Sequence, residues 1–374
     1  MTQELIEKRQ ENSKQFSLDS KRRQLRVSIG AIHYKDNYAD DKEMWKDIDL
    51  TWEDKKIARA PYELAVDDYK LTIRNKKTGK VSTIEIDTIA GKKLATPIWQ
   101  FSEGLARVSN IALDTDLEIV AEFGAVRFTR ILKSNKAPIE AKFKVAGDFV
   151  VRASDADGEI PVESTLVDGI LTETLGLADR PIKYPVRIDP TYQVGTGADD
   201  GVWYLTTFNN SADQTYLGNA GASMTSYWRF TLVDIPQGST IDTAYLIFRS
   251  KGDNGGTTCN VLLDANDADT AVAPTSAADG NGKDRTTENA PWNSIPAWSY
   301  LEVVNSPSIV SPVQEVINRP GWVALNALMI FAWNNGSDNL AYRQSESYEE
   351  TTVYCPQLVV TFSPPFSGRG WAQK

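Results

Sequence analysis

Histidine and cysteine are almost missing from this chain, whose 374 residues include one His and two Cys. One imidazole cannot build an HExxH zinc site, and any Ser-His-Asp or Cys-His arrangement would have to use His33. The GxSxG elbow, the CxxC pair and the phosphate-binding GxxxxGK[ST] loop are also absent from the sequence. We therefore predict that the protein is not an enzyme and that His33 is a structural or surface residue.

The scarcity of His and Cys does not exclude one class of enzyme. A glycosidase needs only two carboxylates across a cleft. The chain has 50 Asp and Glu, but no pair among them stands out from ordinary solvated acids. A polysaccharide-degrading enzyme is therefore a third interpretation, behind the two given below.

A basic face and a long apolar run are missing as well. The net charge of −10 and the pI near 4.9 argue against a nucleic-acid-binding body, because phosphate contacts need Lys and Arg. No run of about 18 apolar residues could span a bilayer, and the first residues lack the apolar core of a secretory signal. We expect no nucleic-acid partner and no membrane insertion.

The two cysteines, Cys259 and Cys355, are too few for a disulfide scaffold. Both lie in strands that we predict for the C-terminal domain. Two alternatives stay open. The thiols could pair if their strands are neighbours, or they are buried apolar side chains, as free Cys often is.

Most of the chain alternates apolar with polar residues, which is the pattern of antiparallel strands with one face in water. In a strand over residues 227–232 this alternation places Trp228 and Phe230 on one face. A turn at Gly238 then leads to a second strand over residues 244–248. In the first half of the chain we predict strands over residues 27–34, 45–52, 62–66, 69–74, 81–86, 106–112, 117–123, 126–133, 139–145 and 149–153.

Helix is scarce in this pattern. The best candidate covers residues 312–319, with Ser311 as its N-cap. Its apolar residues Val313, Val316 and Ile317 fall on one face. We expect the helix to pack across an open end of a sandwich.

These patterns predict an all-β fold of two antiparallel β-sandwich, jelly-roll-like domains with a short polar N-terminal arm. A doubly wound sheet would need interleaved helices. A segment of Gly and small polar residues, 193–201, gives the boundary between the domains. The predicted parts are the arm (1–26), an N-terminal β-rich domain (27–192), a C-terminal β-sandwich (193–362) and a tail (363–374).

The predicted arm offers only Leu5 and Ile6 as an apolar face for a short helix. Two interpretations stay open. It is either a solvated tail or a segment that becomes ordered on a partner subunit. In the second case the assembly residues would be the basic cluster of Lys21, Arg22, Arg23 and Arg26.

The run from Tyr227 through IPQGSTIDTAYL, which ends at Leu246, resembles the core signature of DNRLRE-type domains. Further matches follow in order at residues 290–292, 311–322 and 356–362. These domains are β-sandwiches related to carbohydrate-binding modules and occur in large surface and secreted proteins. The resemblance implies such a fold for roughly the last 170 residues, and only weakly a carbohydrate ligand.

A second resemblance concerns the first half of the chain. Segments 32–52, 137–143 and 184–191 resemble the β-rich region that precedes such sandwiches in surface proteins and phage structural proteins. It implies that the two halves form one displayed structural protein.

Glycan binding would need exposed aromatic platforms beside polar groups. Buried core Trp is the alternative. The candidates are Trp203, Trp292, Trp298, Trp333, Tyr342 and Arg343.

Calcium is the one candidate cofactor. Two segments alternate oxygen donors as calcium loops do, although neither is a complete EF-hand loop. The alternative is polar turns held by Asp and Asn side chains. The donors are Asp155, Asp157, Glu159, Asp264, Asn266, Asp267 and Asp269.

The leading interpretation is a non-enzymatic structural protein of a tailed-phage virion, either capsid-decorating or tail-associated, with an outward sandwich that binds host glycans. Its partners would be other virion proteins, copies of itself and a host-surface glycan. A virion component is released by lysis, so the expected location is the virion. The alternative is a secreted or cell-surface carbohydrate-binding protein.

Overall fold

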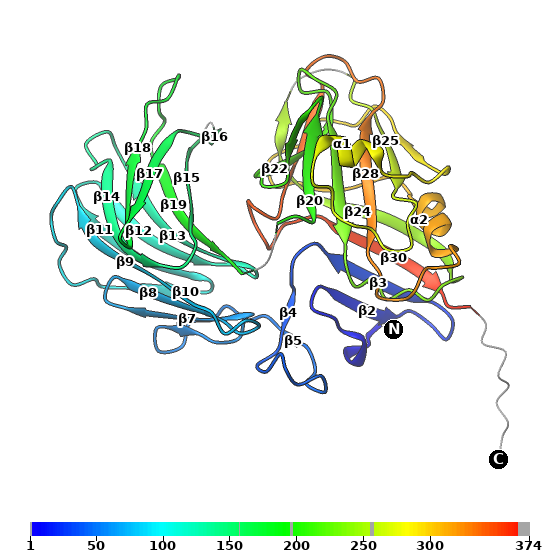
Figure 1. The fold of residues 1–374 in the computed structure, drawn as a ribbon, viewed down its shortest axis with the longest axis horizontal. Helices are drawn as coiled ribbons and strands as arrows, with labels where there is room; N and C mark the ends of the chain where they lie inside the picture. Colours follow the sequence, from blue (N-terminus) through cyan, green and yellow to red (C-terminus); the bar gives the residue numbers. More distant parts are fainter. Residues whose placement is uncertain (1, 157, 195–196, 255–257, 366–374) are drawn as a thin grey trace. The chain divides into compact units, whose positions relative to one another are not determined.

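The computed structural model describes residues 2–156, 158–194, 197–254 and 258–365. The chain divides into two compact units, residues 33–195 and residues 1–32 with 196–374. We call them the continuous unit and the discontinuous unit. Almost all regular structure is antiparallel sheet (Figure 1), so the predicted all-β sandwich class is confirmed. Among the described residues, no helix has the length and apolar character needed to cross a membrane.

The continuous unit contains two seven-stranded sheets, ordered β10-β11-β12-β13-β19-β15-β16 and β17-β18-β14-β9-β8-β7-β6, and the small pair β4-β5. Its strands are β4 (His33–Tyr34), β5 (Lys46–Asp47), β6 (Lys56–Ile57), β7 (Tyr62–Asp67), β8 (Lys70–Asn75), β9 (Val81–Ile89), β10 (Gln100–Ser102), β11 (Leu105–Ala112), β12 (Thr115–Ala121), β13 (Ala125–Leu132), β14 (Glu140–Ala146), β15 (Val150–Asp155), β16 (Gly158–Glu159), β17 (Val162–Val167), β18 (Ile170–Leu175) and β19 (Val186–Gln193).

Alternation along these strands builds the core of the continuous unit. In β7, Tyr62, Leu64 and Val66 are buried while the residues between them face outward. Phe128 and Phe143 meet edge to face with ring centroids 6.1 Å apart. The period of two therefore decides which side chains fill the sandwich.

The discontinuous unit contains an eight-stranded sheet, β1-β2-β3-β30-β24-β29-β22 with β27 on β24, and a six-stranded sheet, β21-β20-β23-β28-β25-β26. Its strands are β1 (Gln3–Glu4), β2 (Ser13–Ser17), β3 (Arg23–Ser28), β20 (Asp200–Tyr204), β21 (Thr207–Asn209), β22 (Gln214–Gly218), β23 (Thr225–Phe230), β24 (Thr240–Asn254), β25 (Val261–Ala265), β26 (Ala290–Trp292), β27 (Val303–Asn305), β28 (Leu328–Asn334), β29 (Tyr342–Glu346) and β30 (Gln357–Ser363).

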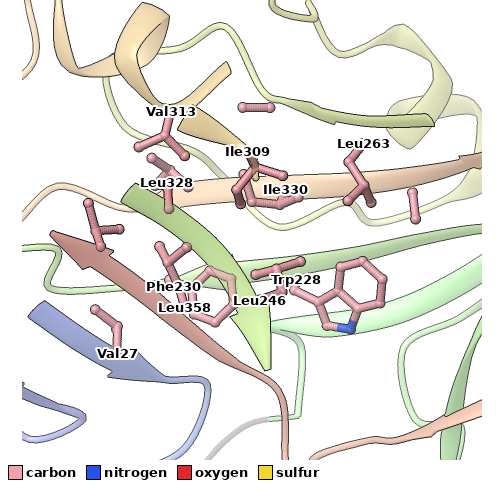
Figure 2. Packing of buried hydrophobic residues seen from close by; sticks show 14 of the residues in the cluster. Val27, Trp228, Phe230, Leu246, Leu263, Ile309, Val313, Leu328, Ile330 and Leu358 are labelled. Atoms are coloured by element: carbon pink, nitrogen blue, oxygen red, sulfur yellow. The ribbon is translucent and has the colours of Figure 1, made fainter. Parts of the chain in front are cut away.

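The core of the discontinuous unit lies between these two sheets (Figure 2). Trp228 and Phe230 face inward from β23, as the alternation predicts. They pack with side chains of β3, β24, β25, β28 and β30, and with the residues around one helix. The residues labelled in Figure 2 are Val27, Trp228, Phe230, Leu246, Leu263, Ile309, Val313, Leu328, Ile330 and Leu358.

The predicted turn around Gly238 carries the chain from one sheet to the other, because β23 and β24 lie in different sheets. Gly238 has φ +71°, a left-handed conformation that costs glycine little. The Ser239 hydroxyl donates a 2.7 Å hydrogen bond to the carbonyl of Pro236. This turn therefore connects the two layers of the sandwich.

Helices are few, as the sequence predicts. They are the 3-10 turn η1 (Ile6–Lys8), α1 (Ala277–Gly282) and α2 (Val310–Ile317). The predicted boundaries of α2 are wrong, since it begins two residues earlier and Ser311 lies inside it. Val313, Val316 and Ile317 are buried as expected, and they pack in the core of the discontinuous unit.

The prediction of a separate N-terminal arm is wrong. Strand β3 pairs with β30, placing Leu25 opposite Val360 and Val27 opposite Leu358. Both side chains are fully buried. Residues 1–32 therefore belong to the discontinuous unit, because an apolar pair on β3 completes its core.

Cys259 and Cys355 are both buried and both free. Burial raises the pKa of Cys355 to about 11. The structure thus has buried thiols and no disulfide between these two residues. Of the predicted tail, residues 366–374 lie outside the described residues.

Candidate functional site

Aromatic side chains gather on the outer face of the six-stranded sheet. On β28, Phe331 and Trp333 point outward because Ile330 faces the core. The Trp203 ring on β20 lies 6.1 Å from Phe331 and 5.9 Å from Trp333, centroid to centroid, both edge to face. Two of the predicted glycan residues, Trp203 and Trp333, are therefore brought together.

Helix α1 covers Trp203. The Trp203 indole N–H donates a 2.9 Å hydrogen bond to the side-chain oxygen of Asn281, which lies in this helix. A Cβ on Gly280 would lie 2.8 Å from the Trp203 ring, so only glycine allows this close approach. Trp203 is 2% exposed. It is a core residue in this structure and not an open platform.

The Arg285 guanidinium lies over the same aromatic face, 3.3 Å from the ring centroid of Phe331 and 3.9 Å from that of Trp333. The Asp264 carboxylate accepts hydrogen bonds from Arg285 at 3.3 Å and from the Trp333 indole at 3.1 Å. Burial lowers the pKa of Arg285 to about 10 and raises that of Asp264. The cation therefore occupies the ring faces against which a sugar would stack.

The other glycan candidates lie elsewhere. The rings of Trp292 and Trp298 each lie 6.2 Å from Phe248 in the core region between the sheets. The buried Arg343 guanidinium donates to the carbonyls of Ile295 and Pro296, 2.6 Å each, which fixes the segment before Trp298.

The sixth candidate, Tyr342, is half-buried beside Tyr216, with ring centroids 5.5 Å apart. The six candidates thus do not form one site. Glycan binding stays a prediction.

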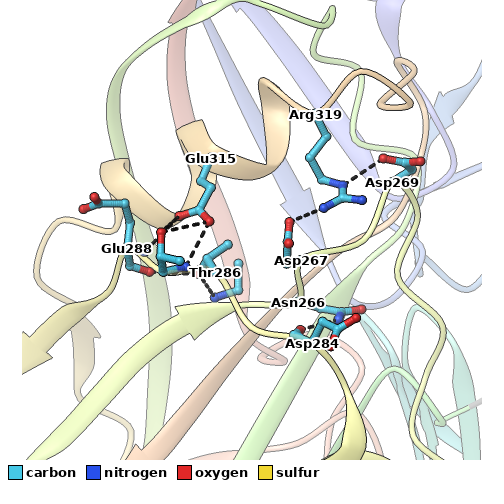
Figure 3. A network of polar contacts seen from close by, with 10 residues as sticks. Asn266, Asp267, Asp269, Asp284, Thr286, Glu288, Glu315 and Arg319 are labelled. Carbon is cyan, nitrogen blue, oxygen red and sulfur yellow. Dashed lines mark hydrogen bonds and ion pairs between the residues drawn. The ribbon is translucent and has the colours of Figure 1, made fainter.

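One group of calcium candidates is held by an arginine (Figure 3). Arg319, just after α2, contacts Asp267 and donates a 2.8 Å hydrogen bond from Nε to Asp269. Asn266 uses its side-chain amide to reach the Asp284 carbonyl at 2.8 Å. In this arrangement a guanidinium neutralises the two carboxylates and ties their loop to the helix.

The other group of calcium candidates, Asp155, Asp157 and Glu159, is not seen to form one site. The Asp155 carboxylate accepts hydrogen bonds from both terminal nitrogens of Arg180, at 2.8 and 2.7 Å, and the Asp155 side chain is fully buried. Glu159 is exposed, and Asp157 lies outside the described residues. Within the described ranges, no group of three or more His, Cys, Asp or Glu is placed to hold a metal ion. The calcium prediction gains no support.

The predicted assembly residues form a rigid surface instead of an arm. We call residues 13–28, strands β2 and β3 with their turn, the basic hairpin. Lys14 pairs directly opposite Arg26, whose guanidinium lies 5.3 Å from the centre of the Phe16 ring. The hairpin has five Lys and Arg, against one Asp. The basic residues are Lys14, Lys21, Arg22, Arg23 and Arg26.

The charge of the basic hairpin contrasts with the rest of its unit. Residues 197–365 contain eighteen Asp and Glu but only seven Lys and Arg. The Asp19 carboxylate and the Arg22 guanidinium form a 2.7 Å ion pair within the turn. The remaining positive charge of the hairpin is therefore a local feature of an acidic unit.

Sequence reasoning missed two buried ionisable sites. Arg130 and Glu173 form a 2.7 Å pair in the continuous unit, and both side chains are fully buried. A signal existed, since Glu173 alternates with Leu171 and Leu175 at inward positions. The other group, Asp200, has no such signal because it sits at the Gly-rich boundary.

Asp200 is a buried acid on β20. One carboxylate oxygen accepts a 3.0 Å hydrogen bond from the Tyr348 amide, and the other has no hydrogen-bond partner. Burial, with a smaller contribution from nearby Asp199, raises the pKa of Asp200 to about 7. Between pH 3.8 and about 7 the folded state therefore holds a proton that the unfolded chain releases.

Asp200→Asn is expected to remove a pH dependence of stability. The ordinary pKa is 3.8 and the folded pKa about 7, so stability should fall as pH rises through this window and stay low above it. At pH 8 the variant should be more stable by about 1–3 kcal/mol. Urea unfolding of both proteins at several pH values measures this. Asp242→Asn, at an exposed carboxylate of the same unit, should leave the slope unchanged. Equal slopes for all three proteins would contradict the prediction.

No known protein family and no curated protein matches this sequence. Among solved structures, the chain is similar to a glycoside hydrolase family 43 arabinoxylan arabinofuranohydrolase from Bacillus subtilis, in complex with cellotetraose. That match has 7% identity and a TM-score of 0.19, over 87% of this chain and 93% of that chain. The N-terminal domain of the Streptococcus gordonii adhesin Sgo0707 matches at 8% identity and TM-score 0.15, over 94% and 91%. Scores this low carry no argument about fold or function.

Proposed function

We propose that the chain is a non-enzymatic structural subunit of a tailed-phage virion, capsid-decorating or tail-associated, that works by contacts between protein surfaces. The sequence resemblances to display-type sandwiches and phage structural proteins support this proposal. The burial of three candidate glycan-binding residues supports it as well, because their side chains pack inside the fold. They are Trp203, Trp298 and Arg343. Within the proposal, the partners are other virion proteins and the location is the virion.

The observation that carries the proposal is the basic hairpin. Its strands continue the eight-stranded sheet, so its charges are held on a rigid support. Lys14 and Arg26 lie side by side on the outer face of that sheet, since Leu25 and Val27 on the same strand face the core. A fixed cluster of this kind attracts an acidic protein surface and fixes its orientation.

The double substitution Lys14→Glu and Arg26→Glu is expected to prevent incorporation of the chain into virions. Particles of the phage whose genome carries this reading frame should contain many copies of the unchanged chain by quantitative peptide mass spectrometry. Reversal of two charges turns attraction into repulsion. Binding of the unchanged chain to particles lacking it should also weaken with added salt, because salt screens exposed charges.

The matched control reverses two exposed lysines of the continuous unit, Lys42→Glu and Lys92→Glu. It changes the net charge equally and should still be incorporated. Absence of the unchanged chain from purified particles would overturn the virion proposal. Equal incorporation of both variants would show that the basic hairpin is not the contact.

A further inference from the structure

Strand β17 is the longest free sheet edge among the described strands. It pairs with β18 on one side only, and its six residues follow a regular register without a bulge. The other edge strands of the continuous unit, β6, β10 and β16, have two or three residues. A row of backbone N–H and C=O groups along β17 therefore faces away from the sheet.

Both faces of β17 are exposed. Residues 163–167 are all exposed, and Leu166 and Val167 are 59% and 65% exposed. Ser164 and Leu166 share a face with their buried β18 partners Glu173 and Leu171, so they point toward the interior side of the sheet. Both side chains are nevertheless exposed there. The edge therefore presents uncovered apolar side chains as well as backbone groups.

The usual devices that protect an edge are missing from β17. It contains no proline and only one charged residue, Glu163. Pro161 lies just before the strand, outside it. Such an edge is a template for one more antiparallel strand.

We propose that β17 pairs antiparallel with β17 of a second copy, around a two-fold axis that passes midway between the two Thr165 residues. A strand paired with its own copy in this way forms a closed, isologous contact, and the axis runs perpendicular to the sheet. The exposed run 163–167 is centred on Thr165, so this register uses every exposed residue of the strand. The inference does not depend on the proposed virion function.

The register also suits the side chains. It sets Thr165 opposite Thr165 of the second copy, Ser164 opposite Leu166, and Glu163 opposite Val167. The two Glu163 carboxylates are therefore never opposite each other, whereas directly opposed like charges would destabilise the pair. Leu166 and Val167 lose water contact on association, which favours it.

Cysteine cross-linking tests this register. Thr165→Cys places two thiols opposite each other across the axis, at a Cα separation of about 4.5–5.5 Å, within disulfide range. Under oxidised glutathione we expect a covalent dimer on non-reducing gels. Ser164→Cys is the matched control, because register offsets its two thiols by two residues. The native cysteines are buried and should not interfere.

Light scattering on the full chain gives the second readout. The mass should rise toward a dimer over about a hundredfold range of concentration, because association follows mass action. Thr165→Lys should stay a monomer, since it opposes two cations at an exposed position that the monomer fold does not need. A monomer for the unchanged chain at every concentration, or cross-linking of Ser164→Cys as fast as Thr165→Cys, would overturn the proposal.

Discussion

A chain that begins at residue 29 is expected to lose the cooperative unfolding transition of the discontinuous unit. Such a chain lacks β3, and with it the fully buried side chains of Leu25 and Val27. Burial of each is worth about 1.5–3 kcal/mol, and the pairing of β3 with β30 is lost as well. A domain is stable by only about 5–15 kcal/mol, so the loss takes a large share of the total.

Urea unfolding followed by tryptophan fluorescence and circular dichroism measures this effect. The transition of the continuous unit should persist in the shortened chain, because residues 33–195 have their own core. Lys21→Ala with Arg22→Ala, at exposed positions of the hairpin turn, should leave both transitions nearly unchanged. A shortened chain that keeps a full transition for the discontinuous unit would contradict the placement of β3.

Arg130→Ala is expected to destabilise the continuous unit by about 3–5 kcal/mol, because it leaves Glu173 buried without its partner. The wild-type guanidinium also donates to the carbonyls of Pro138 and Ile139, at 2.9 and 3.2 Å. Burial raises the pKa of Glu173 to about 7 even with Arg130 beside it. Without the cation that pKa rises further, and the variant should recover part of its stability at low pH.

The informative control replaces both members of the pair, Arg130→Met with Glu173→Leu. A well-packed apolar pair in place of a buried ion pair is neutral or stabilising by about 1–4 kcal/mol in other proteins. Free energies of unfolding for Arg130→Met, for Glu173→Leu and for the double variant close a cycle. A single variant as stable as the wild type would contradict the burial of this pair.

Strands with a clear period of two could be predicted from the sequence. The predicted strand over residues 81–86 lies within β9, and the inward set of Trp228 and Phe230 is correct. Local alternation is enough in these cases, because it reports burial on one face. The pairing partner of each strand could not be predicted in this way, because pairing depends on residues far away in sequence.

The error at the N-terminus shows this. Residues 23–28 also alternate, with Leu25 and Val27 as the apolar pair, but the polar residues before them suggested an arm. The strand that pairs with these residues, β30, is more than 300 residues away. The residues near β3 in sequence therefore give no information about its pairing with β30.

The prediction of binding sites from the sequence was limited in the same way. Aromatic and acidic residues could be found in the sequence, but what lies against them could not. Arg319 comes from a helix end about fifty residues after Asp267 and Asp269, and α1 covers Trp203. A tryptophan or a row of acidic residues can thus form a binding site only if no other part of the chain packs against it.

The pairing of β3 with β30 also sets an order of events during translation. About 330 residues separate Val27 from Leu358, and ribosomes add roughly 5–20 residues per second. The hairpin that carries β3 therefore waits roughly 20–60 s for its neighbouring strand. Residues 33–195, which have a hydrophobic core of their own, leave the ribosome during that interval. The nascent chain accordingly needs to keep the strand that carries Leu25 and Val27 from other contacts until its partner strand β30 has been made.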